Sequence, residues 1–383
     1  MRPPMPPFHV MEVMRAAEER AQAGGEVLHL EVGQPSTPAP TAVREAAAIA
    51  LREQTLGYTT ALGLPELRER IAAWHRSTQG VVVDPARVVV TAGASGGFVL
   101  AFLTAFAPGD RVAVTAPGYP CYRNTLEALG IEPVVVELDP AESYALTPDL
   151  LERHGDLDGL VLASPANPTG TMLDETSLDA IAAWCEHRGV LLVADEIYHG
   201  ITYDRPAAPA LGRCDRTVVL NSFSKYFSMT GWRIGWMVVP DELAQSVERA
   251  AQNLYICAPV LSQFAACAAF VATEELDGHV HRYARNRSIL LDGLHAAGLL
   301  RHAPADGAFY VYADVSHLGL PASELGRRWL DELGVAVTPG IDFDARRGED
   351  SVRFSFAGAT AEIAEAVDRI GAWVVEHGRP AGR

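Results

Sequence analysis

Residues suited to chemistry follow several short apolar runs of this sequence. A segment of small residues, Ala92 to Gly97, comes after the run VVVT and opens a helical pattern. The first N–H groups of a helix are free and suit a phosphate, although a plain helix entry has the same composition. Asp195 ends the run VLLVAD, and Lys225 follows TVVLNS within SFSK. Taken alone, an aspartate there could be a turn former, and most lysines are solvated surface charges.

The elements that must position these residues are strands of a mostly parallel sheet. Short runs rich in β-branched residues alternate with helical patterns, which is typical of an α/β fold. Ligands of such sheets bind beyond the carboxyl ends of the strands, where the segments above lie. The predicted strands are residues 87–91, 111–115, 132–138, 159–164, 190–195, 217–222 and 233–239. We therefore expect a large domain built on a seven-stranded sheet.

The pattern changes after a long helical segment predicted from about Glu242 to Thr273. Beyond it, helix, strand, helix, strand, strand and helix follow and end near Val375, which indicates a smaller α+β domain. Prolines 35, 38 and 40 interrupt the chain before a helix that starts near Thr41. We expect an arm over residues 1–40 that packs with the small domain, a large domain over 41–275 and a small domain over 276–383.

Composition restricts the class of protein. The 383 residues carry 31 basic and 48 acidic side chains, a formal charge of −17, which disfavours nucleic acid and anionic membranes as partners. The five cysteines are widely spaced among apolar neighbours, as in a reducing compartment. The first twenty residues hold no apolar run suited to a signal peptide, and no apolar stretch suits a membrane span. The sequence predicts a cytoplasmic protein.

Several segments, in this order along the chain, resemble the class I and II aminotransferases, enzymes of fold type I that use pyridoxal phosphate. They are LEVGQPSTPAP (30–40), GYTTALGLPELR (57–68), TAGASGG (91–97), PGYPCY (117–122), SPANPTG (164–170), ADEIYHG (194–200), SFSKYFSMTGWRIGW (222–236) and VRFSF (352–356). The resemblance covers nearly the whole chain. It implies an α/β fold with a large cofactor-binding domain and a smaller domain.

The resemblance also implies roles for individual residues around pyridoxal phosphate. Lys225 would hold the cofactor as a Schiff base, and Asp195 would keep its ring nitrogen protonated, because an opposite charge favours the protonated form. Asn167 and Tyr198 would contact the phenolic oxygen, and Tyr119 would stack on the ring. The matching phosphate ligands are Ser95, Gly96, Ser222, Ser224, Arg233 and Tyr58, the last from a neighbouring subunit of a homodimer. Without the resemblance, Arg233 reads as a surface ion pair and Tyr119 as a core tyrosine.

Substrate binding is implied for Arg353, Gly33 and Asn167. A guanidinium pairs with an α-carboxylate through two parallel hydrogen bonds, whereas Gly33 could also be a simple turn glycine. The implied reaction is a ping-pong transfer of an amino group from an L-amino acid to a 2-oxo acid, with no metal ion. Which amino acid is used stays open, although Phe8 and the stretch 255–258 favour a neutral or aromatic side chain.

Two alternatives remain from the sequence. The same lysine, aspartate and arginine also serve β-eliminating lyases, cyclases and amino-acid oxidases, which share the cofactor chemistry. A non-catalytic binding module on this fold is the second alternative, and the intact Lys225, Asp195 and Arg353 argue against it.

Overall fold

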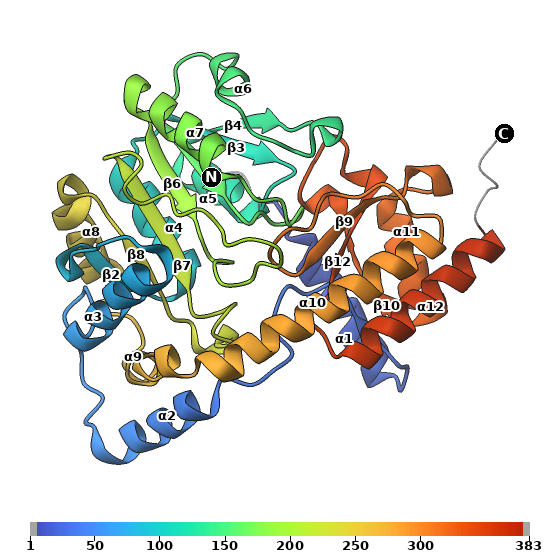
Figure 1. Cartoon of the computed structure of the whole chain (residues 1–383), viewed down its shortest axis with the longest axis horizontal. Coiled ribbons are helices and arrows are strands. Elements are labelled where there is room, and N and C mark those ends of the chain that lie inside the picture. The colour runs from blue at the N-terminus through green and yellow to red at the C-terminus, as the bar shows by residue number, and fades with distance from the viewer. Residues whose placement is uncertain (1–5, 378–383) are drawn as a thin grey trace.

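The computed structural model describes residues 6–377. Seven strands form one sheet in the order β2-β8-β7-β6-β5-β3-β4 (Figure 1). Pairings are parallel from β7 through β6, β5 and β3 to β4, whereas β8 runs antiparallel to both of its neighbours. The strands are β2 (Val88–Thr91), β3 (Arg111–Ala116), β4 (Glu132–Glu137), β5 (Gly159–Ala163), β6 (Leu191–Asp195), β7 (Thr217–Ser222) and β8 (Gly235–Val238). The predicted mostly parallel α/β sheet is confirmed.

Apolar residues on both faces of the sheet explain why these strands are nearly continuous β-branched runs. Val88 and Val90 point to one face, and Val89 between them points to the other. The first face is covered by α2 (Thr41–Glu53), α3 (Pro65–Trp74), α7 (Glu175–Arg188) and α9 (Val260–Cys267). The second face is covered by α4 (Gly93–Ala105), α5 (Pro120–Leu129) and α8 (Asp241–Leu254).

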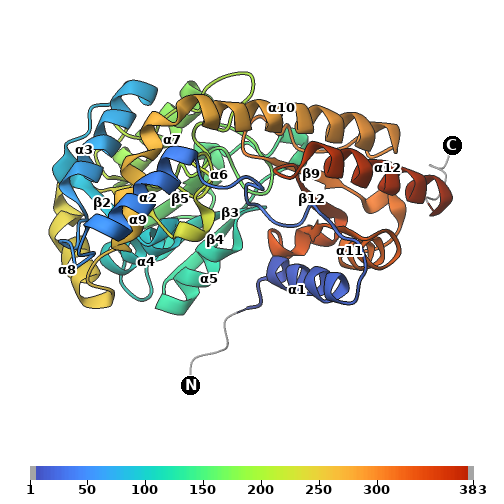
Figure 2. The same ribbon diagram turned by 90° about the horizontal axis from the view of Figure 1, so that it is seen from below.

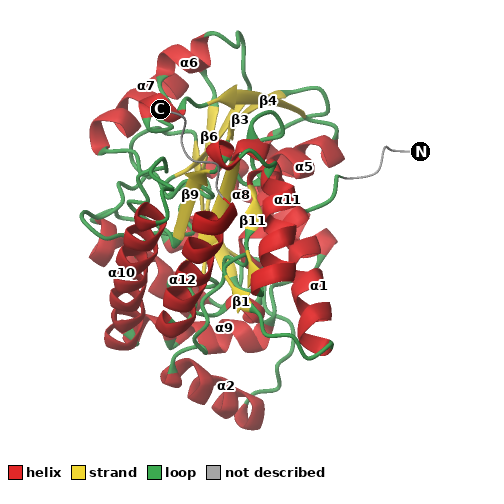
Figure 3. Cartoon of the chain, turned by 90° about the vertical axis from the view of Figure 1, so that its right-hand side faces the viewer, coloured by secondary structure: helices red, strands yellow, loops and turns green. Residues whose placement is uncertain are grey.

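A second, three-stranded antiparallel sheet has the order β11-β12-β9. Its strands are β9 (Tyr310–Asp314), β11 (Thr338–Pro339) and β12 (Ser351–Ser355), and its helices are α10 (Thr273–Ala296), α11 (Ala322–Arg328) and α12 (Thr360–His377). Figure 3 views the molecule from this side. The long helix α10 extends from the region of the large sheet to the small one (Figures 1 and 2). The predicted boundary at residue 275 falls in its first turn, and the division into domains stays a prediction.

The N-terminal segment lies against the smaller sheet. Strand β1 (Leu28–His29) pairs in parallel with β10 (Val335–Ala336), and α1 (His9–Gln22) buries Ala17 against Leu330 and Ala336. Helix α1 therefore shares a small apolar core with Leu330 and with β10, and it lies beside the smaller sheet and its helices (Figure 2). Residues 1–5 and 378–383, which belong to the predicted arm and small domain, lie outside the described residues.

The single long helix predicted from Glu242 to Thr273 is wrong. Helix α8 ends at Leu254, and α9 begins at Val260, directly after Pro259. Proline cannot donate the backbone hydrogen bond that a continuous helix needs, and Ile256 adopts a left-handed φ of 68° in the connection. Within residues 6–377, no helix is long and apolar enough to cross a membrane.

Candidate active site

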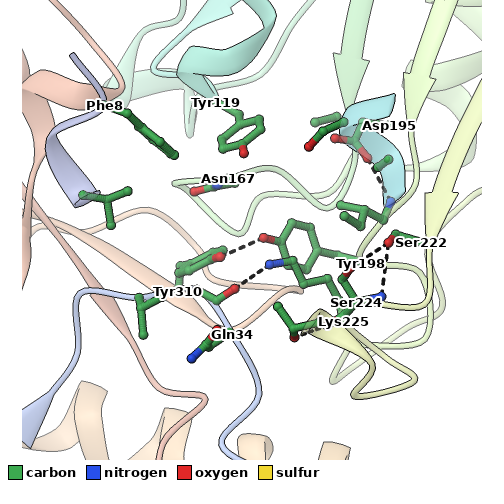
Figure 4. Close-up of a pocket in the computed structure, with 18 of the residues that line it drawn as sticks. Phe8, Gln34, Tyr119, Asn167, Asp195, Tyr198, Ser222, Ser224, Lys225 and Tyr310 are labelled. Atoms are coloured by element: carbon green, nitrogen blue, oxygen red, sulfur yellow. Dashed lines mark hydrogen bonds between the residues drawn. The ribbon is translucent and has the colours of Figure 1, made fainter. Parts of the chain in front are cut away.

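The strand ends of the large sheet and two segments of the smaller one meet at a cavity of about 570 Å³ (Figure 4). Of the predicted site residues, all but Gly96 and Tyr58 line this cavity. They are Gly33, Ser95, Tyr119, Asn167, Asp195, Tyr198, Ser222, Ser224, Lys225, Arg233 and Arg353. The fold thus gathers residues that lie up to 320 positions apart in the sequence.

Lys225 lies on a tight turn that follows β7. The Ser222 hydroxyl fixes the turn by donating to Ser224 Oγ at 2.9 Å and accepting the Ser224 N–H at 3.1 Å. The amine Nζ of Lys225 points into the cavity and donates to the Gly33 carbonyl oxygen at 2.5 Å (Figure 4). Burial lowers the Lys225 pKa to about 8, and the positive charge of Arg353 acts in the same direction. A far larger fraction of the amine is therefore neutral near pH 7 than for an ordinary lysine, while the charged form still predominates below pH 8.

Asp195 ends β6 and is 4% exposed. The hydroxyl of Tyr122 donates to its Oδ2, and the backbone N–H of Ile197 donates to Oδ1 at 3.0 Å. Burial raises the Asp195 pKa to about 6, while these two hydrogen bonds oppose the rise. The carboxylate is therefore mostly ionised at pH 7, and it can pair with a cationic group bound in the cavity.

One end of the cavity is rich in hydrogen-bond donors. Ser95 in the first turn of α4, together with Ser222, Ser224 and Arg233, lines this end. Gly93 opens α4 with a left-handed φ of 74°, and a Cβ placed there would come within 2.6 Å of Arg233 Nη2. Free helix N–H groups, hydroxyls and a guanidinium together suit a phosphate group. The left-handed φ favours glycine at position 93, and a Cβ there would push the guanidinium away from α4.

Arg353 lies at the other end of the cavity and is 3% exposed. Its Nη1 donates to Asn167 Oδ1 at 3.0 Å, and its Nη2 donates to the Glu31 carbonyl oxygen at 2.5 Å. Among the described residues, its Nε is a buried donor with no hydrogen-bond partner. The Arg353 Cζ lies 4.4 Å from the ring centroid of Tyr310 and 4.8 Å from that of Phe343. Nη2 also donates to Thr338 Oγ1 at 3.3 Å, so the guanidinium is held in place by three hydrogen bonds while its Nε stays without a partner.

Two aromatic pairs complete the walls. The hydroxyl groups of Tyr198 and Tyr310 are hydrogen-bonded at 2.7 Å. The ring of Phe8 meets that of Tyr119 edge-on, with centroids 5.9 Å apart. Figure 4 shows Phe8 and Tyr119 on the side of the cavity opposite Tyr198, Tyr310 and Lys225. A planar ring could therefore lie between the two sides.

Three predicted features lie away from the cavity. Gly96 belongs to the first turns of α4 but is not part of the cavity wall, and Tyr58 is 82% exposed. The stretch 255–258, expected to flank the substrate, contributes no residue to the wall, whereas Phe8 does. These four residues belong to the connection between α8 and α9.

Sequence reasoning gave no role to Tyr122 and Tyr310. Tyr122 follows Tyr119 by three residues, and the helix that contains it begins at Pro120. Residues three apart lie on the same side of a helix, so this spacing could have indicated that both tyrosines face the site. Tyr310 lies in the buried strand YVYAD, and its aromatic residues resemble those of any core strand. The pairing of β9 with β12, which sets Tyr312 opposite Arg353, places Tyr310 near the site. This pairing cannot be read from the sequence.

Comparisons with known proteins agree with this arrangement. The family described as aminotransferase class I and II matches residues 25–370. A valine–pyruvate aminotransferase of Mycobacterium tuberculosis is 51% identical over 98% of both chains. The crystal structure of an aminotransferase from Mycobacterium tuberculosis superimposes with a TM-score of 0.95 at 50% identity, covering 97% of both chains.

An aspartate aminotransferase of Thermus thermophilus, solved with maleate, superimposes with a TM-score of 0.91 at 31% identity, over 97% of this chain and all of that one. Members of this family are generally dependent on pyridoxal phosphate. The chain belongs to the class I and II aminotransferases, enzymes that move an amino group between an amino acid and an oxo acid.

Proposed function

We propose that the protein is a pyridoxal-phosphate-dependent aminotransferase that works by a ping-pong mechanism at the cavity around Lys225. The observation that carries the proposal is that one cavity gathers the donors Ser95 and Arg233, the buried Asp195 and Lys225, and Arg353 with its unpaired Nε. A phosphorylated pyridine aldehyde and an amino-acid substrate need these groups together.

The fit to the cofactor rests on the close approach of Arg233 to α4. A Cβ at Gly93 would displace the guanidinium, and a Cβ at Gly235 would come within 3.0 Å of the Ala94 N–H. The two glycines thus let β8 and the Arg233 guanidinium lie close to the start of α4, and we assign the phosphate to the donors gathered there. Ser95, Ser222 and Ser224 would add hydroxyl donors, and Gly96 a backbone N–H.

Each remaining residue has a separate proposed role. Pyridoxal phosphate, when bound, supplies a carbonyl group that receives the amino group and a ring that withdraws electrons from the substrate Cα. Lys225 Nζ would remove the Cα proton, and its lowered pKa keeps the amine neutral enough to act as a base. Asp195 would keep the ring nitrogen protonated, Asn167 and Tyr198 would bind the phenolic oxygen, and Tyr119 would cover the ring.

Substrate orientation is the proposed role of Arg353 and Gly33. The unpaired Nε of Arg353 can donate to a substrate carboxylate, and a two-bond grip would require Nη2 to exchange its contact with Thr338 Oγ1 at 3.3 Å for the carboxylate. Gly33 lies against the Tyr310 hydroxyl, since a Cβ there would come within 1.8 Å of it. The substrate Cα would then lie between Arg353 and Lys225.

A homodimer in the cytoplasm is also proposed. Tyr58 is 82% exposed, and the nearby α2 exposes Ile49 and Leu51 by 46% and 60%. Exposed apolar side chains near a residue expected to reach a neighbouring site favour a subunit contact. All five cysteines are free, which is compatible with a reducing compartment.

The test is a half-reaction without an acceptor. The reconstituted protein is mixed with valine, the amino acid in the name of the mycobacterial relative, and the oxo acid released is counted. A transaminase releases one equivalent per site and stops until pyruvate or another oxo acid is added. Continued release of ammonia without acceptor would instead indicate a lyase or an oxidase.

A further inference from the structure

One wall of the cavity consists of apolar side chains from the N-terminal segment. Phe8, Val10, Met11 and Met14 from α1 and its first flanking residue line it, together with Val32. None of these residues has a part in the function proposed above. They lie at the edge of the cavity where Gly33 and Gln34 also contribute to the wall.

Every charged side chain that lines the cavity already has a role in the proposed function. Among the described residues that line it, the charged ones are Asp195, Lys225, Arg233 and Arg353. Each has a proposed partner on the cofactor or at the substrate α-carbon and α-carboxylate. Among the described residues that line this cavity, none is left to pair with a charged substrate side chain, and burial of an unpaired charge is strongly unfavourable. Further charges, Arg15, Glu18 and Glu31 among them, line an adjoining cavity whose wall also includes Met11 and Met14.

The carboxylate of Asp342 holds this wall in place. Helix α1 has no side-chain cap of its own at Phe8. Instead, the His9 N–H donates to Asp342 Oδ1 and the Val10 N–H donates to Oδ2, each at 3.1 Å. Asp342 is 2% exposed and lies more than 330 residues away in the sequence. It satisfies two free N–H groups and complements the positive end of the helix.

The turn that carries Asp342 contacts two further walls of the cavity. The carbonyl oxygen of its neighbour Phe343 accepts the Gly118 N–H at 3.0 Å, next to Tyr119. The Phe343 ring also lies 4.8 Å from the guanidinium of Arg353. The short segment Asp342–Phe343 thus contacts three parts of the cavity wall. These are the start of α1, the loop before Tyr119 and the guanidinium of Arg353.

We propose that the first turns of α1, seated by Asp342, select substrates with uncharged apolar side chains. The proposal rests on the aminotransferase function above and names its substrate class. Phe8 and Met14 contact the side chain, and Asp342 acts as a positioning residue.

The first experiment compares half-reaction kcat/KM for valine, leucine, aspartate and lysine. We expect aspartate and lysine to be at least about 100-fold poorer than valine or leucine, because their charges would be buried without partners. Comparable values for aspartate and valine would overturn the selection while leaving the aminotransferase function intact. No reaction with any amino acid would instead overturn the function itself.

The second experiment places a cation in the wall. Met14→Arg should raise the aspartate-to-valine ratio of kcat/KM at least about tenfold, since the guanidinium can pair with the distal carboxylate. Met14→Leu, which keeps the wall apolar, should leave the ratio unchanged. An unchanged ratio in Met14→Arg, with the protein folded, would show that α1 does not contact the substrate side chain.

The third experiment tests whether Asp342 fixes the position of α1. Asp342→Asn replaces one acceptor oxygen by an amide donor, so one of the two α1 N–H groups loses its partner. We expect faster hydrogen–deuterium exchange over residues 9–22 and a several-fold higher KM for valine, with kcat less affected. Asp174→Asn is the control, because Asp174 caps α7 through the Ser177 N–H at 2.7 Å and lies on the surface. Unaltered exchange and KM in Asp342→Asn would contradict the role of Asp342.

Discussion

At the scale of single residues, the lowered pKa of Lys225 has a direct consequence for cofactor capture. Its ordinary value of 10.5 falls to about 8 because the amine is surrounded by protein and faces Arg353. Only the neutral amine attacks an aldehyde, so the reactive fraction increases as the pH rises through the folded-state pKa. The same group in an unstructured chain would stay charged until about pH 10.

We therefore predict that the cofactor-free protein takes up pyridoxal phosphate faster as the pH rises, with half of the increase reached near pH 8. Stopped-flow absorbance between pH 6 and pH 10 measures this rate. The second ionisation of the phosphate is complete near pH 7 and does not interfere above it. A midpoint near 10 would mean that Lys225 is not desolvated.

Substitution of Arg353 can distinguish a role in substrate binding from a role in cofactor binding. An ammonium cannot reproduce the planar guanidinium, so Arg353→Lys should reduce kcat/KM for amino acids by about 30-fold or more, the loss expected for a buried charge-assisted pair. Reaction with a simple amine that lacks the carboxylate should change little. Half-reaction rates for the amino acid and its decarboxylated amine give the comparison. Equal losses for both would assign Arg353 to the fold.

At the scale of elements, the start of α4 must stay free of side chains where Arg233 approaches it. Gly93→Ala should weaken pyridoxal phosphate binding at least about tenfold, because a left-handed alanine is strained and its Cβ meets Arg233 Nη2 at 2.6 Å. Gly96→Ala is the matched control three residues on, since its Cβ would meet Ala92 Cβ at an ordinary 3.5 Å. Equilibrium titration of both variants measures the difference. Equal affinities would remove Arg233 from the phosphate site.

The same elements show how far a sequence can be read. All seven strands of the large sheet follow from their β-branched runs, and the residues after β6 and β7 could be placed because parallel strands end at one edge. The break between α8 and α9 was not predicted, because the helical pattern of apolar residues continues across it. The left-handed backbone at Ile256 and the missing N–H of Pro259 end α8 all the same. Asp342 could not be found, because its partners are backbone N–H groups of α1.

At the scale of the whole molecule, the exposed Tyr58 predicts that sites are shared between subunits. If Tyr58 reaches a neighbouring site, a hybrid dimer of Tyr58→Ala and Lys225→Ala has one site with both residues intact. Random pairing of equal amounts makes half of the dimers hybrid, so about a quarter of all sites should be active. Coexpression followed by activity measurement tests this. Activity no greater than the sum of the two separate variants would mean that Tyr58 serves its own chain or none.

In the proposed function, Lys225 and the residues around it transfer an amino group. The most direct measurement follows the nitrogen of ¹⁵N-valine mixed with unlabelled pyruvate and the reconstituted protein, by mass spectrometry. We expect the label in newly formed alanine, with one 2-oxo acid released per alanine, and no labelled alanine from Lys225→Ala. Label recovered as ammonia, or undiminished label transfer by Lys225→Ala, would contradict the proposed function.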